Sequence, residues 1–336
     1  MSTSTLGSII DKMRFLFSGP RPLNVTQSDA EDDEYESIHQ DSSLERIKID
    51  PLPEVREPFN EYTGMTCPEL YIVHSLPKVG GSTIAATLMA NFGFAHVSHV
   101  HCLTENGSRI WGAALPRYRR SFRDAVTQHL YQARKAAMLL EAGAALFPRT
   151  QKRAVICGVR EPISWALSLY FESFSGLCGD DYGEISLEAV AGFVRDVLAG
   201  ERADLGLPFL SPERWLRTEF FRAHKFDIFA EDFDLEKGYQ VYESEVTPIL
   251  IIRQENLSSL AESLSSLLGY PAELIEPVNA NQAESKSYSG IYKNIRKALK
   301  FDREWLRSIY AHAYSRKFYS ESECEFFTER WARQPG

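Results

Sequence analysis

The chain has 336 residues, of which 44% are hydrophobic and 25% charged, a balance that is ordinary for a globular protein with a sizeable core. The formal net charge is −9 without a basic stripe, which argues against a general nucleic-acid binder. No run approaches the roughly 20 apolar residues that a membrane-spanning helix needs, so no transmembrane segment is expected.

The cysteines indicate a reducing environment. No two of the five form a Cys-x-x-Cys pair, and their number is odd. This spacing argues against a disulfide framework and a structural zinc site, and it favours a cytoplasmic location. The five are Cys67, Cys102, Cys157, Cys178 and Cys324.

Residues 1–64 are expected to be a poorly ordered leader. Residues 28–43 are acidic and polar, and three prolines follow before residue 60. Such a stretch buries too little apolar area to offset the entropy of ordering. The weakly amphipathic segment Ile9–Phe17 leaves peripheral membrane contact open beside the simpler reading of a frayed terminus. One folded domain is expected over residues 65–336.

The predicted elements alternate between strand and helix along this domain. Apolar, β-branched runs predict buried strands at Leu70–Ser75, Phe94–His101, Arg153–Val159 and Thr247–Arg253. Helical patterns occupy Thr83–Phe92, Arg119–Leu146, Ile163–Phe174, a segment opened by Ser211 and Pro212, Ser258–Leu268, and the chain from about Tyr288. This order predicts an α/β fold of three layers, with a central parallel sheet flanked by helices.

The first strand runs into a turn that is suited to an anion. The segment 71–88 reads YIVHSLPKVGGSTIAATL, so a Gly-Gly turn opens the following helix. Glycines allow a ligand oxygen to approach the backbone, and the helix start carries free N–H groups and partial positive charge. A plain strand-to-helix turn with an exposed lysine is the alternative. The candidate phosphate-binding residues are Lys78, Val79, Gly80, Gly81, Ser82 and Thr83.

A second candidate follows the third strand. Arg160 lies at the end of that strand, Pro162 begins the next helix, and Ser168 comes about two turns into it. A strand-end arginine faces the crevice in which doubly wound sheets bind ligands, and its planar fork pairs well with phosphate. A salt-bridged arginine and a solvent-facing serine would be the ordinary structural explanation.

Together these two motifs resemble those of the sulfotransferases that use 3′-phosphoadenosine 5′-phosphosulfate (PAPS). In that family a strand-Pro-Lys-x-Gly-x-Ser/Thr-helix turn binds the 5′-phosphosulfate, and an Arg with a Ser eight residues later binds the 3′-phosphate. The segments 214–229, 233–242 and 249–257, with His99–His101, are similar to the branch of capsular polysaccharide synthesis proteins. The resemblance covers roughly residues 68–300 and implies a P-loop-like fold.

The resemblance implies an enzyme that moves a sulfuryl group from PAPS to a hydroxyl of a carbohydrate acceptor, without a metal. Lys78 is expected to stabilise charge on the departing oxygen. His101 is the preferred general base, with His99 as the alternative or its orienting partner. In a late polar segment, Lys286 is expected to add a basic contact to the donor, with Lys293 as the alternative; solvated charges on a helix would be the structural explanation. Arg253 and Glu255 are expected to form a structural ion pair.

Two other functions stay open at this stage. A P-loop small-molecule kinase would need a lysine after the glycines and a hydroxyl that holds Mg²⁺, whereas Lys78 precedes them. A catalytically silent protein with the same fold could instead serve in polysaccharide assembly.

Overall fold

The structure is a computed structural model, and its description covers most of the chain beyond residue 68. It describes residues 69–93, 95–118, 120–146, 152–178, 185–202, 205–206, 210–244, 247–280, 286 and 288–333. The expected leader, residues 1–64, lies outside this part, so the predicted domain boundary remains a prediction. Within the described part no helix combines the length and apolarity needed to cross a bilayer.

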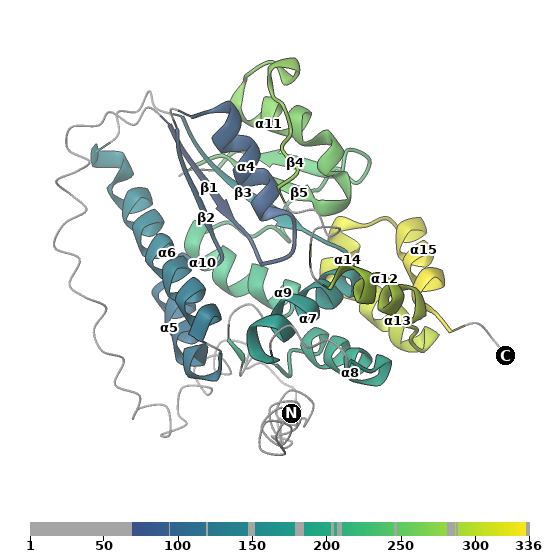
Figure 1. The fold of residues 1–336 in the computed structure, drawn as a ribbon. Helices are drawn as coiled ribbons and strands as arrows, with labels where there is room; N and C mark the ends of the chain where they lie inside the picture. Colours follow the sequence, from purple (N-terminus) through teal and green to yellow (C-terminus); the bar gives the residue numbers. More distant parts are fainter. Residues whose placement is uncertain are drawn as a thin grey trace. The chain divides into compact units, whose positions relative to one another are not determined.

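A five-stranded sheet forms the centre of the fold, in the order β2-β1-β3-β5-β4 (Figure 1). The first four strands in this order are parallel, and β4 pairs antiparallel with β5 at the edge. The four predicted strands are confirmed, with ends that differ by a few residues. Sequence analysis missed β4, a four-residue edge strand with little apolar signal. The strands are β1 Glu69–His74, β2 His96–Val100, β3 Lys152–Val159, β4 Tyr239–Tyr242 and β5 Ile249–Arg253.

The helices connect these strands and extend the chain beyond β5. Two helices were not predicted, α5 and α8; two glycines, Gly107 and Gly112, weaken the helical signal of α5. The helices are α4 Gly81–Asn91, α5 Glu105–Ala114, α6 Arg120–Leu146, α7 Pro162–Cys178, α8 Leu187–Leu198, α9 Pro212–Trp215, α10 Phe221–His224, α11 Leu260–Leu268, α12 Ser289–Ala298, α13 Arg303–Ala311, α14 Ala313–Phe318 and α15 Glu321–Trp331. A π-helical turn, Leu216–Phe220, joins α9 to α10.

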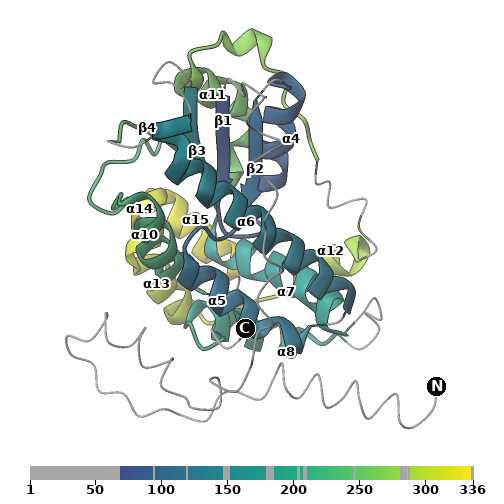
Figure 2. The same ribbon diagram turned by 90° about the vertical axis from the view of Figure 1, so that its left-hand side faces the viewer.

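Both faces of the sheet are buried, which gives the three predicted layers. Tyr71 and Val73 of β1 pack with α4 and α11, whereas Leu70 and Ile72 join the larger core on the opposite face. This alternation follows from the two-residue period of a strand, and covered faces are the rule for parallel sheets. Figure 2, which is turned by 90° from Figure 1, shows α4 beside β2 and α6 running along the sheet.

The strand order also locates the crevice in which a ligand can bind. The chain leaves β1 through α4 to reach β2 on one side, whereas β3 lies on the other side of β1. Connections therefore diverge above the carboxyl ends of β1 and β3. Open α/β sheets bind ligands at such a switch point.

Candidate functional site

The turn after β1 has the backbone shape of an anion-binding loop. Lys78 and Gly80 have positive φ angles, 70° and 93°, and Val79 between them does not. The first hydrogen bond of α4 runs from Ile84 N to Gly80 O at 3.1 Å, and no side chain caps the helix. The N–H groups of residues 81–83 therefore lack intrahelical partners. A lysine in the left-handed region is uncommon, and such residues gather at ligand sites.

The turn after β3 lies directly beside this loop. Arg160 Nη1 donates to the Lys78 carbonyl and to Ser168 Oγ, each at 2.9 Å. Ser168 Oγ also lies 3.3 Å from the Tyr292 hydroxyl. Arg160 Nε is buried without a partner among the described residues. A buried guanidinium nitrogen without an acceptor destabilises the folded protein unless a ligand supplies that acceptor.

These two turns line one cavity of about 420 Å³. Among its described lining residues are three cations, Lys78, Arg160 and Lys286, and no carboxylate. Such a concentration is notable because the whole chain carries a net charge of −9. The remaining wall combines polar and apolar groups: Gly80, Thr83, Ser168, Gln254, Leu257, Ser258, Pro277, Val278, Asn279, Tyr288 and Tyr292.

One charged residue that was not predicted contacts two residues of the cavity lining. Glu172 Oε2 accepts from Lys78 Nζ at 3.1 Å and from the Tyr288 hydroxyl at 3.2 Å. Burial acts to raise the pKa of Glu172, but Lys78 and Lys286 outweigh it and hold that pKa below its usual value. The available signal was spacing, because Glu172 lies one helical turn beyond Ser168.

Three of the predicted loop residues, Val79, Gly81 and Ser82, do not line the cavity. Val79 is buried, and its carbonyl lies close to Gly158 of β3. Gly81 is buried against His99, since a Cβ at Gly81 would lie 2.4 Å from His99 Nε2. Ser82 is exposed. The cavity is therefore lined by Lys78, Gly80 and Thr83 rather than by the whole loop.

The two predicted histidines lie next to each other but not in the lining of this cavity. His99 pairs with Val73 across β1 and β2, and its ring centroid is 5.0 Å from that of His101. A third histidine, His129 of α6, was not predicted, and its ring centroid lies 5.2 Å from that of His101. No group of three potential metal ligands is found within the residues that the structure describes.

Burial keeps both predicted histidines neutral. It lowers the pKa of His99 to about 4, with a smaller contribution from His129. Burial likewise holds the pKa of His101 well below its ordinary value. His101 Nδ1 lies 2.6 Å from the Ser75 carbonyl, which can only accept, so Nδ1 carries the proton and Nε2 is left with a lone pair.

The loop that follows His101 rests on a buried carboxylate. Glu219, in the π-helical turn, accepts from the N–H groups of Leu103 and Thr104 at 2.6 and 2.9 Å. His74 belongs to the same buried cluster, with Nδ1 at 2.9 Å from His224 Nε2. His74 is completely buried and is therefore a core residue.

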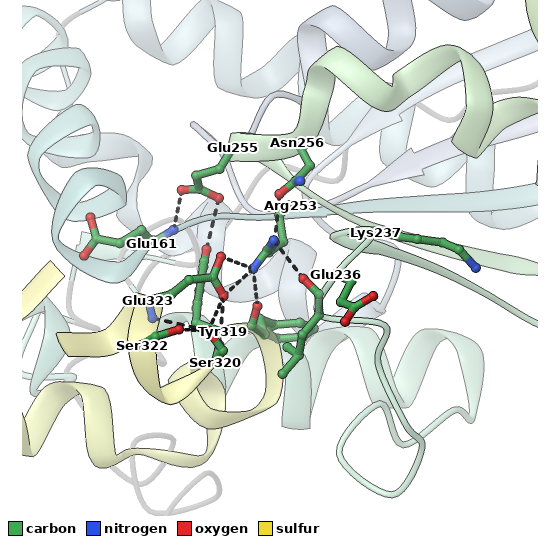
Figure 3. A network of polar contacts seen from close by, with 12 residues as sticks. Glu161, Glu236, Lys237, Arg253, Glu255, Asn256, Tyr319, Ser320, Ser322 and Glu323 are labelled. Atoms are coloured by element: carbon green, nitrogen blue, oxygen red, sulfur yellow. Dashed lines mark hydrogen bonds and ion pairs between the residues drawn. The ribbon is translucent and has the colours of Figure 1, made fainter. Parts of the chain in front are cut away.

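The predicted ion pair between Arg253 and Glu255 is wrong. Arg253 Nη1 instead binds the carboxylate of Glu323 on α15 at 2.8 and 3.0 Å, and Nε donates to Asn256 (Figure 3). Glu255 accepts from the N–H of Glu161 and from the Tyr319 hydroxyl. The partner of Arg253 lies 70 residues away in sequence, so neighbouring residues gave no indication of it.

The fold and the cavity define an α/β protein with a cation-lined crevice at the carboxyl ends of a mostly parallel sheet. A family model described as "Putative capsular polysaccharide synthesis protein" matches residues 210–320, about a third of the chain. Over that stretch the chain is similar to proteins of polysaccharide synthesis. The curated proteins and the solved structures give no match. The matched stretch contains Gln254 and Tyr288 of the cavity wall, whereas Lys78 and Arg160 precede it.

Proposed function

We propose that this protein is a sulfotransferase that moves a sulfuryl group from PAPS to a hydroxyl of a carbohydrate. One observation carries the proposal: Lys78 and Arg160, from the ends of adjacent strands, line the same cavity and touch through the hydrogen bond from Arg160 Nη1 to Lys78 O. Two cationic turns in one cavity fit a nucleotide that bears phosphate at both ends. The apolar and aromatic wall suits a base and a ribose.

Each phosphate-bearing end has its own group of residues in this proposal. The free N–H groups after Gly80 and the Lys78 ammonium bind the 5′-phosphosulfate. Arg160 and Ser168 bind the 3′-phosphate, which supplies the acceptor that Arg160 Nε lacks among the described residues. Lys286 adds a third positive charge to the cavity lining.

The reaction is an in-line displacement at sulfur. The acceptor oxygen forms a bond to sulfur while the bond from sulfur to the bridging oxygen of the 5′-phosphate breaks. Lys78 stabilises the negative charge that develops on that oxygen. The acceptor proton passes to a histidine; His101 has its Nε2 lone pair fixed by the Ser75 carbonyl, and His99 is the alternative. Adenosine 3′,5′-bisphosphate (PAP) leaves with both phosphates. The chemistry requires no metal ion.

The carbohydrate acceptor is proposed from the family match over residues 210–320. The kinase alternative has less support, because Lys78 precedes the glycines and no lysine directly followed by a hydroxyl residue comes after them in the turn.

Transfer from sulfur-labelled PAPS to a panel of glycans tests the proposal directly. We expect labelled glycan with wild-type protein and none with Lys78→Ala. In parallel, PAP should raise the thermal midpoint while ATP with Mg²⁺ should not, because a ligand stabilises according to its concentration relative to Kd. Stabilisation by ATP with Mg²⁺ alone would favour a kinase. Stabilisation by PAP without transfer to any glycan would favour the silent protein.

A further inference from the structure

Three tyrosines of the C-terminal helices direct their hydroxyls at the turns after β3 and β5. They are Tyr310 in α13, Tyr314 in α14 and Tyr319 directly after α14, and none is more than 4% exposed. Each hydroxyl contacts a turn residue that lies more than 60 positions earlier in the chain. The C-terminal helices therefore hold the two turns in place through these hydrogen bonds.

Tyr314 holds the backbone of Arg160 at both of its polar groups. Its hydroxyl accepts from Arg160 N at 3.0 Å and donates to Arg160 O at 2.8 Å. A phenol can make both bonds at once, because it carries one proton and two lone pairs. Tyr314 is buried, so water cannot readily replace these bonds if the hydroxyl is removed.

The other two tyrosines hold the residues that flank Arg160 in the fold. Tyr310 donates to Glu161 Oε1 at 2.6 Å, and the Glu161 carboxylate accepts from the N–H groups of Ile163 and Ser164 at the start of α7. Tyr319 donates to Glu255, which accepts from the Glu161 N–H (Figure 3). The turn is thus fixed relative to helix α7, which carries Ser168.

From this arrangement we infer that Tyr314 is a positioning residue for the 3′-phosphate, and that it acts through Arg160. The inference rests on the proposed function, since Arg160 is the 3′-phosphate contact only if the donor is PAPS. Arg160 Nη1 already donates to Lys78 O and Ser168 Oγ, and these two bonds restrict where the rest of the guanidinium group can lie. A backbone that moves at Arg160 would misplace that group. Arginine's fork requires such alignment to bind phosphate in two places.

The test compares ligands with and without the 3′-phosphate. Calorimetric titration gives the Kd of PAP and of adenosine 5′-phosphate for wild type and for Tyr314→Phe. Tyr314→Phe removes both hydrogen bonds to the Arg160 backbone. If the misplaced arginine loses one hydrogen bond to the 3′-phosphate, PAP should bind about tenfold more weakly and adenosine 5′-phosphate nearly unchanged, so their affinity ratio falls about tenfold. Tyr131→Phe, on the exposed face of α6, is the matched control and should keep the wild-type ratio.

The outcomes separate this inference from the proposed function. If wild type shows no preference for PAP, the proposed function fails and this inference fails with it. If wild type prefers PAP and Tyr314→Phe keeps the same affinity ratio, whether both affinities are unchanged or both fall in proportion, the inference alone is overturned. Tyr310→Phe provides a second variant should Tyr314→Phe fold poorly, and a smaller loss of the ratio is expected because its contact reaches Arg160 through Glu161.

Discussion

Gly158 allows β3 to pack directly against the loop that follows β1, and alanine at this position should disturb that loop. A Cβ on Gly158 would lie 2.5 Å from the Val79 carbonyl oxygen and 3.0 Å from Val79 Cγ2. Carbon and oxygen atoms rarely approach closer than about 3.3 Å, so the carbonyl would have to retreat by about 0.8 Å. The obstacle is backbone, which cannot simply rotate away as a flexible side chain can.

The displacement caused by Gly158→Ala should lower both the stability and the activity of the protein. Overpacking of this kind destabilises a core by about 1–3 kcal/mol, which urea denaturation will detect. Val79 lies between Lys78 and Gly80, so the retreat also moves the residues that line the cavity. A misplacement near 1 Å can lower a catalytic rate by about 100-fold, and we expect PAP binding and sulfuryl transfer both to fall.

Gly192→Ala is the matched control, because no atom lies within 4 Å of a Cβ built on Gly192 in α8. Alanine in a helix interior should stabilise the protein by about 0.5–1 kcal/mol and leave ligand binding unchanged. If Gly158→Ala unfolded at the same urea concentration as Gly192→Ala and bound PAP equally well, the close approach of β3 to the loop would be refuted.

Three further predictions concern the two cationic turns, a buried histidine and a buried arginine. Lys78→Ala should lower kcat far more than it lowers donor affinity, whereas Arg160→Ala should weaken the binding of PAP and leave kcat nearly unchanged. If steady-state kinetics showed that both variants change the same parameter, these roles would be contradicted. Folding should weaken from pH 6.5 to pH 4, because the unfolded chain protonates His99 near pH 6.5 and the folded protein only at about pH 4. Between pH 7 and 5 this contribution is on the order of 2 kcal/mol, and His99→Gln should flatten the dependence of the urea midpoint. Arg253→Met should lower the free energy of unfolding by about 3–5 kcal/mol, because it leaves the partners of a buried cation unpaired. The exposed ion pair of Arg217 should contribute under about 1 kcal/mol. Equal losses of stability in Arg253→Met and Arg217→Met would contradict the role of burial.

The alternation of strands and helices, and the two turns that line the cavity, could be predicted from local sequence patterns. Both turns are local, since a buried apolar run, a Gly-Gly or Arg-x-Pro turn and a helix start are contiguous in the chain. The parallel sheet then brings turns from adjacent strand ends together without further information. For this reason Lys78, Arg160 and Ser168 could be predicted as neighbours before any coordinates were known.

The residues that complete and support that cavity depend on long-range packing and could not be predicted from local patterns. Glu172 of α7 contacts Lys78 in the loop after β1, and Gly158 of β3 approaches Val79 in the same loop. Tyr314 reaches Arg160 from 154 residues further along the chain. No local pattern encodes such contacts, because they depend on how helices and strands pack after their own hydrogen bonds have formed. The expected ion pair of Arg253 was wrong for the same reason, because the packing of α15 brings the distant carboxylate of Glu323 to Arg253.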